Sequence, residues 1–142
     1  MRPGDLVTVL VTGVGNGGVC IARYDGQVVF LRGALPGERV TARVTQANSK
    51  FLRAQVVEVL EASEHRVEPP CRYASMCGGC DWQHVAVDHQ RVLKAEVVRE
   101  QMSHLGGVQD EAMWEVFRVQ ALEPDALRWR TRNRFQRASP DS

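Results

Sequence analysis

Apolar and polar residues alternate over most of the first 62 positions, in short runs that are separated by turn residues. An Asp-Gly pair at Asp25-Gly26 divides two of these runs and is typical of a β-hairpin. Five strands are predicted: Leu6–Val11, Val19–Arg23, Gln27–Leu31, Arg39–Thr45 and Phe51–Leu60. Because closure removes the exposed edges of a small sheet, this pattern predicts a small closed barrel, with an SH3-like barrel as the alternative.

The pattern changes after residue 62. A polar linker ends at Pro69-Pro70, a cysteine-rich loop follows over residues 71–84, and a helical period runs over Val87–Leu105 to Gly106-Gly107. The predicted apolar stripe of this helix consists of Ala95, Val98, Met102 and Leu105. Two further strands are predicted over residues 115–120 and 127–136, before a tail that we expect to be disordered. The predicted division is therefore 1–63, 64–105 and 106–142.

Charge adds little for the whole chain and more for its end. The 142 residues carry 18 basic and 17 acidic side chains, so the net charge of +1 indicates no partner. Residues 127–142 hold five arginines and one acid, and alternation in a strand would place four of the arginines on one face. The alternative is a charged row that protects a sheet edge. Because no apolar run approaches the roughly 18 residues of a membrane helix, we expect a cytoplasmic protein without a membrane partner.

A glycine motif near the start imitates a nucleotide site. Gly13, Gly15 and Gly18 match the G-x-G-x-x-G spacing, with Glu38 twenty residues further on. That motif works only where a helix N-terminus faces the pyrophosphate. Here the glycines lead into a predicted hairpin, so the sequence favours a loop between two strands over dinucleotide binding.

Three cysteines gather in ten residues. Cys71, Cys77 and Cys80 have C-x5-C-x2-C spacing, which favours a metal site over disulfide bridges in a reducing compartment. Three possibilities follow from this spacing: zinc with His84 as fourth ligand, an iron–sulfur cluster, or reduced thiols without metal. Cys20 lies within a predicted strand, where a buried free thiol is the usual state.

Two segments resemble a known family. Residues 13–18, 21–26, 28–30 and 33–40 resemble a TRAM domain, a small OB-like RNA-binding barrel. The cysteine loop through Gln83 and His84, with Gln90 and Lys94 on the next helix, resembles the iron–sulfur loop of the RNA (uracil-5-)-methyltransferases. That family methylates uridines in 23S ribosomal RNA or transfer RNA. Residues 130–135 resemble the arginine-rich strand that opens its central α/β domain, whose truncated start we expect here.

The resemblance implies a 4Fe-4S cluster on Cys71, Cys77 and Cys80. The family's fourth ligand is a later cysteine, and none follows Cys80 in these 142 residues, so an incomplete cluster is expected. The resemblance also places S-adenosylmethionine binding and the catalytic cysteine in a C-terminal domain that these residues do not include. We therefore expect an RNA-binding and iron–sulfur segment without catalytic activity alone. The alternatives are a zinc-stabilised RNA-binding module, or a subunit completed by a separately encoded methyltransferase domain.

Basic and aromatic residues are the candidate RNA contacts, because phosphates attract cations and bases stack on aromatic rings. The predicted contacts are Arg23, Arg32, Arg39, Arg43, Lys50, Phe51, Arg53, Arg130, Arg132 and Arg134. The alternative in the barrel is a solvated face, balanced by acids that include Glu38 and Glu61. His84 is expected to be a structural hydrogen-bonding residue, and Trp82 to pack beside the cysteines. The sequence offers no catalytic set.

Overall fold

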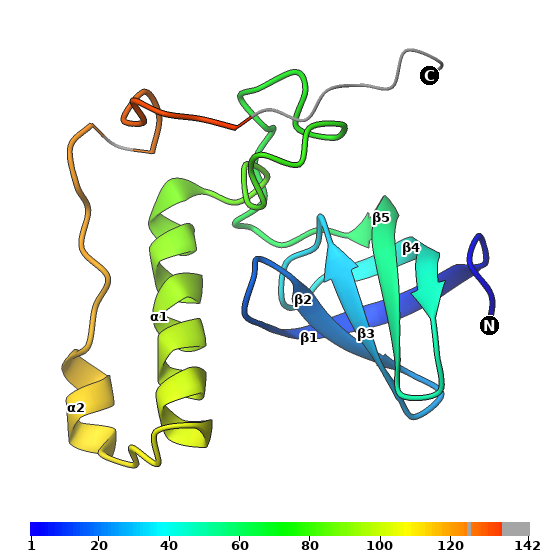
Figure 1. The fold of residues 1–142 in the computed structure, drawn as a ribbon, viewed down its shortest axis with the longest axis horizontal. Helices are drawn as coiled ribbons and strands as arrows, with labels where there is room; N and C mark the ends of the chain where they lie inside the picture. Colours follow the sequence, from blue (N-terminus) through cyan, green and yellow to red (C-terminus); the bar gives the residue numbers. More distant parts are fainter. Residues whose placement is uncertain (125, 135–142) are drawn as a thin grey trace.

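The computed structural model describes residues 1–124 and 126–134, and Figure 1 shows a barrel beside a helical segment. Seven elements follow in chain order: β1 (Leu6–Val14), β2 (Cys20–Tyr24), β3 (Gln27–Arg32), β4 (Arg39–Ala47), β5 (Phe51–Glu61), α1 (Val87–His104) and α2 (Glu111–Val116). The five predicted strands and the predicted long helix are thus confirmed. No helix among the described residues is long and apolar enough to cross a membrane.

The strands close into a barrel in the order β1-β2-β3-β5-β4. All neighbours are antiparallel except β3 and β5, which run parallel. The mainly β, OB-like prediction is confirmed, since this non-sequential closure is a five-stranded Greek-key barrel. The predicted hairpin between β2 and β3 turns at Asp25 and Gly26, which have φ values of 46° and 80°. Two consecutive positive φ values define the type I′ turn that suits a two-residue hairpin.

Alternation decides what fills the barrel. On β1, the buried side chains are Val7, Val9 and Val11, and the residues between them are exposed. A small apolar core of valines, leucines and alanines results, and it also includes Cys20. The glycine motif at residues 13–18 lies at the end of β1 and in the turn before β2, as the hairpin interpretation predicts. A strand rather than a helix follows it, so the dinucleotide geometry is absent there.

A second apolar cluster joins the helical segment to the barrel. Leu93 of α1 is buried with Val14, Leu35 and Val85, and Val97 packs against this cluster. The predicted apolar stripe of the helix was therefore wrong, since Val98, Met102 and Leu105 are exposed. The face of α1 that carries Leu93 meets the barrel instead, because Val14 and Leu35 supply the apolar surface opposite it.

The two strands predicted after α1 are not present. Residues 111–116 form the helix α2, whose N-cap Asp110 accepts a hydrogen bond from the Met113 N–H at 3.1 Å. Residues 117–124 and 126–134 contain no strand. The physical reason is that a strand needs a neighbour for its backbone hydrogen bonds, and in the described chain no strand pairs with this segment. Phe135, Gln136 and the predicted disordered tail lie outside the described residues.

Candidate nucleic-acid interface and cysteine loop

The outer surface of β2, β3 and β5 carries two aromatic rings and three arginines. We call it the aromatic face; its members are Arg23, Phe30, Arg32, Phe51 and Arg53. Phe30 pairs across the strands with Ile21 and Arg53, and Phe51 pairs with Val28. The two rings meet edge to face with centroids 5.6 Å apart. Both rings are half-buried, so part of each remains exposed on the outside of the barrel.

Arg53 covers both rings of the aromatic face. Its guanidinium carbon lies 5.8 Å from the Phe30 centroid and 5.5 Å from the Phe51 centroid. A guanidinium over aromatic rings is held by cation–π attraction and presents a flat cationic surface. Such a surface can stack on a base or hydrogen-bond a phosphate, which are the two contacts that single-stranded nucleic acid requires.

The remaining predicted barrel contacts are distributed around the barrel. Arg39 and Arg43 lie on β4, where Arg39 pairs with Glu61 at 3.4 Å and Arg43 donates to the Gly4 carbonyl at 3.4 Å. Lys50 is exposed in the turn before Phe51. The structure therefore brings Arg23, Arg32, Phe51 and Arg53 together on one face but places Arg39 and Arg43 on the strand between β1 and β5.

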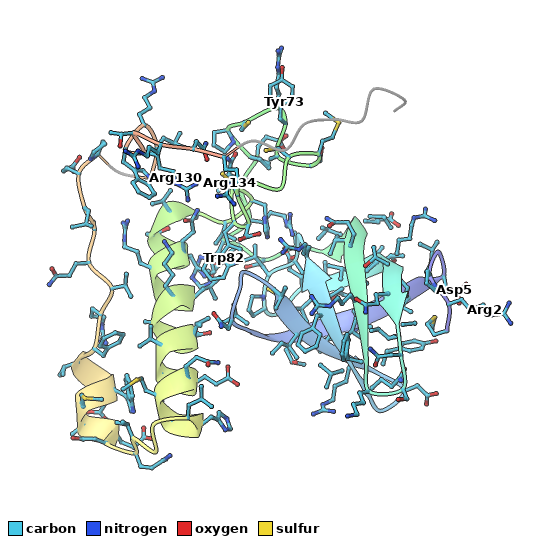
Figure 2. The ribbon with its side chains drawn as sticks, in the orientation of Figure 1. Arg2, Asp5, Tyr73, Trp82, Arg130 and Arg134 are labelled. Carbon is cyan, nitrogen blue, oxygen red and sulfur yellow. The ribbon has the colours of Figure 1, made fainter. Side chains whose placement is uncertain are left out.

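The predicted arginine stripe near the end of the described chain has no strand beneath it. Arg130, Arg132 and Arg134 are exposed on an irregular segment, and Figure 2 shows Arg130 and Arg134 above α1 and the barrel. The guanidinium carbon of Arg130 lies 4.9 Å from the Trp129 centroid. Strand alternation thus does not align these arginines here, and their contact with RNA stays a prediction.

The cysteine loop consists of turns without regular secondary structure. Cys71 is half-buried, and Cys77 and Cys80 are exposed. The Cys77 N–H donates to the Tyr73 carbonyl at 2.8 Å, and the Cys71 N–H donates to the Gln83 side chain at 3.2 Å. In the part of the chain that the structure describes, no three Cys, His, Asp or Glu side chains converge to hold a metal ion. Three thiols on one loop are the donor type that iron–sulfur clusters and zinc take, so the donor chemistry of the loop fits either group.

Cys20 and His84 are held away from such a centre by the barrel. The Cys20 thiol is buried and donates to the Ala34 carbonyl at 3.3 Å, and burial, then Glu38, raises the pKa of this thiol to about 12. His84 is buried, and its Nε2 lies 2.9 Å from the same carbonyl oxygen. These contacts agree with the structural interpretations of both side chains, since the Cys20 thiol and the His84 Nε2 both meet the Ala34 carbonyl oxygen.

A buried ion pair fixes the base of the cysteine loop. The fully buried Glu38 carboxylate accepts from Arg66 Nε at 2.7 Å and Nη2 at 2.8 Å. It also accepts from the backbone N–H groups of Leu35 and Ser63. Burial by itself would raise the pKa of Glu38, but these hydrogen bonds and the Arg66 charge lower it. The alternative of a solvated charged face counted Glu38 among its exposed acids; the structure contradicts this for Glu38, which is buried and compensated by Arg66.

Backbone contacts between residues 66–67 and residues 84–85 join the two ends of the cysteine loop. Arg66 forms a β-bridge with Val85, and the Val67 N–H donates to the His84 carbonyl at 2.9 Å. The segments on either side of residues 68–83 therefore lie next to each other, so these residues form a closed loop. Nearby, His65 and His89 of α1 stack with ring centroids 3.6 Å apart. The barrel, the linker and α1 are joined at this junction.

Acidification is expected to destabilise this junction. Burial lowers the pKa of His84, and burial followed by the His65 charge lowers the pKa of His89. Both pKa values lie at 6.5 in the unfolded chain, so the unfolded state binds protons first as the pH falls. The stability that the neutral rings supply is present above pH 6.5 and lost below it.

Thermal unfolding followed by circular dichroism is expected to give a lower Tm at pH 5.5 than at pH 7.5. His84→Gln is expected to reduce this difference in Tm. A Tm that does not change between the two pH values would contradict the role of the junction.

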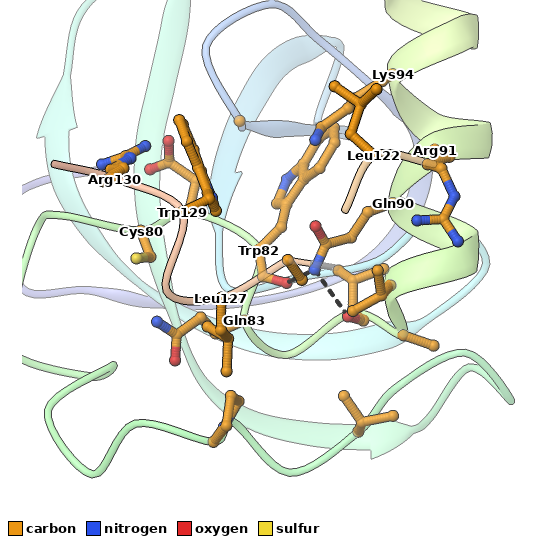
Figure 3. A pocket seen from close by; sticks show the side chains of 18 of the residues that line it. Cys80, Trp82, Gln83, Gln90, Arg91, Lys94, Leu122, Leu127, Trp129 and Arg130 are labelled. Atoms are coloured by element: carbon orange, nitrogen blue, oxygen red, sulfur yellow. Dashed lines mark hydrogen bonds between the residues drawn. The ribbon is translucent and has the colours of Figure 1, made fainter. Parts of the chain in front are cut away.

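A hollow of about 1180 Å³ lies beside the cysteine loop, between α1 and residues 122–124 and 126–130. Figure 3 shows Trp82 at its centre, with Trp129 and Cys80 on one side and Gln90 and Lys94 on the other. Gln90 donates to the carbonyls of Trp82 and Val85, so both its amide hydrogens hold the start of α1 to the end of the loop. Trp82 itself packs against the apolar cluster that joins α1 to the barrel, and of the three loop cysteines Cys80 alone lines this hollow with it.

Sequence reasoning missed four functional or structural residues. Phe30 could have been found, because it occupies the outward position of the β3 alternation. Glu38, Arg66 and Asp81 could not, because their partners lie far away in the chain. Asp81 pairs with Arg32 across 49 positions, and Glu38 pairs with Arg66 across 28.

Comparison with known proteins gives one family model and several relatives. Residues 2–57 match the TRAM domain. An uncharacterized RNA methyltransferase of Streptomyces avermitilis is 48% identical over 93% of this chain and 33% of its own length. The 23S rRNA (uracil(1939)-C(5))-methyltransferase RlmD of Halomonas elongata is 46% identical over 69% of this chain and 20% of its own length. The chain spans about a third or less of these relatives.

Proposed function

Because this chain belongs to the family of TRAM-containing RNA methyltransferases, we propose that its barrel binds single-stranded RNA through the aromatic face. The observation that carries the proposal is the cluster of Phe30, Phe51 and Arg53, two rings beneath one guanidinium. Bases stack on such rings whatever their sequence, and arginine adds contacts to phosphate. Arg23 and Arg32 extend the cationic surface on either side along β2 and β3.

The names of the relatives support a choice of RNA class. The Halomonas protein is named for 23S ribosomal RNA, so ribosomal RNA is the proposed target, with transfer RNA as the competing outcome. We propose that the chain supplies the RNA-binding part of an S-adenosylmethionine-dependent uracil-5 methyltransferase. The groups that transfer the methyl lie, on this proposal, outside these 142 residues, either in the same protein or in a separately encoded partner.

Titration of a labelled oligouridylate by fluorescence anisotropy tests RNA binding. The affinity is expected to fall with salt, with a slope of about −0.7 per phosphate contacted on a single strand. Binding that is independent of salt, or absent at low salt, would overturn the proposal. Methyl transfer from S-adenosylmethionine to unmodified ribosomal RNA by the same preparation would overturn the proposed lack of activity.

We propose that Cys71, Cys77 and Cys80 hold a 4Fe-4S cluster to which these 142 residues supply three cysteine ligands, since no cysteine follows Cys80 in them. The support is the donor set: three thiols on one loop, two of them exposed, with Cys20 and His84 engaged by the barrel. Thiolate sulfur is the ligand that iron–sulfur clusters and zinc prefer. When bound, the cluster would tie together a loop that otherwise has few contacts of its own, because metal binding to such a site contributes directly to folding.

Metal analysis distinguishes the cluster from zinc. After anaerobic reconstitution with iron and sulfide, the chain is expected to retain both elements. Cys77→Ser combined with Cys80→Ser is expected to abolish retention, because two of the three thiolates are then missing. Cys20→Ala is the matched control and is expected to retain the iron, since this thiol lies in the barrel core. Stoichiometric zinc without iron would contradict the cluster and favour a zinc-stabilised RNA-binding module.

A further inference from the structure

We propose that Asp81 is an internal competitor for the RNA phosphate site at Arg32. The proposal rests on the RNA-binding function proposed above and names the regulation of the same face. Arg32 ends β3 and, two residues after Phe30, shares its outward orientation. Arg32 Nη1 lies 2.5 Å from Asp81 Oδ1, so a carboxylate of the cysteine loop occupies a cationic position of the aromatic face.

The contact is open to an incoming anion. The Arg32 and Asp81 side chains are 55% and 43% exposed, so a phosphate can reach the guanidinium without unfolding the loop. An exposed ion pair contributes at most about 1 kcal/mol. A nucleotide whose base stacks on Phe30 and whose phosphate meets Arg32, with Arg53 beside it, makes several contacts at once. Since carboxylate and phosphate bind the same guanidinium donors, the anchored phosphate displaces Asp81.

In addition to its ion pair with Arg32, Asp81 lies close to the barrel at a second point, beside Gly18. A Cβ placed at Gly18, whose φ is +74°, would lie 2.5 Å from the Asp81 Cβ. Only glycine allows the turn between β1 and β2 to approach Asp81 so closely. Gly18 and Arg32 therefore hold Asp81 from two sides, and Cys80 is its neighbour in the chain. Displacement of Asp81 loosens the end of the cysteine loop, and by reciprocity a loop held on the barrel weakens RNA binding.

A double-mutant cycle with labelled oligouridylate tests the competition in the full chain. Asp81→Asn is expected to raise the affinity about two- to fivefold, because Arg32 becomes free. In an Arg32→Gln background, Asp81→Asn is expected to give no gain. Glu61→Gln is the matched control: it removes the same charge from an exposed pair with Arg39 on β4 and is expected to give a smaller gain. A second readout is amide hydrogen exchange, which is expected to accelerate at residues 80–82 when RNA binds.

The outcomes separate the two proposals. No affinity gain in Asp81→Asn, a gain equal to that of Glu61→Gln, or a gain that persists without Arg32 overturns the competition while RNA binding stands. Slower exchange at residues 80–82 on RNA binding overturns it as well. Failure of the unaltered chain to bind oligouridylate at low salt overturns both proposals.

Discussion

Replacement of Glu38 by glutamine is expected to lower the free energy of unfolding by about 3–5 kcal/mol, the cost of breaking a buried ion pair. The substitution removes the negative charge but leaves the Arg66 guanidinium half-enclosed beside it. The carboxylate also binds the N–H groups of Leu35 and Ser63, so the turn before β4 and the linker after β5 lose a shared acceptor. The loss is expected because a compensated charge becomes an unpaired one.

Urea unfolding followed by circular dichroism measures this effect. Glu61→Gln serves as the control, because Glu61 also pairs with an arginine but is exposed, so a change within about 1 kcal/mol is expected. Equal effects of the two substitutions would mean that the Glu38–Arg66 pair does not hold the linker to the barrel.

Removal of both rings of the aromatic face is expected to weaken RNA binding by more than tenfold. Stacking contributes about 1–3 kcal/mol per base. The double variant Phe30→Ala with Phe51→Ala removes both stacking surfaces and also the rings over which the Arg53 guanidinium lies. The rings lie outside the barrel core, so the double variant is expected to keep its fold. Fluorescence anisotropy measures the affinity, and circular dichroism checks the fold.

Leu6→Ala with Leu10→Ala is the matched control for this variant. Both leucines are exposed on β1, where they pair with Arg43 and Arg39 of β4. Their removal subtracts a similar apolar area from another part of the barrel and is expected to leave the affinity within about twofold, as surface substitutions away from a site usually do. A larger loss in the leucine variant than in the phenylalanine variant would place the interface on β1 and β4 instead.

The local pattern of apolar and polar residues predicted the barrel well, because the alternation within each strand indicates which of its side chains are buried. The alternation on β1 and β4 and the Asp25-Gly26 turn specify which side chains face inward and where the chain reverses. The same alternation at residues 128–134 did not produce a strand, because the described chain provides no strand to pair with it. Alternation is therefore informative only where a neighbouring strand completes the sheet.

The parts of the site that the sequence did not predict depend on distant partners. Glu38 has the sequence surroundings of a surface acid, and only the fold brings Arg66 to it. Asp81 pairs with Arg32 only because the loop returns to the barrel at Val85. For the cysteines, spacing indicates the ligand type, whereas the convergence of the three thiols depends on the metal itself.

Mapping of bound RNA on the protein by NMR tests the central claim most directly. Backbone amide shifts of the labelled chain would be followed while unlabelled oligouridylate is added. The account predicts that the largest changes fall on β2, β3 and β5 around Phe30, Phe51 and Arg53, with a further change at Asp81. Changes confined to α1 or to the outer surface of β1 and β4 would contradict it.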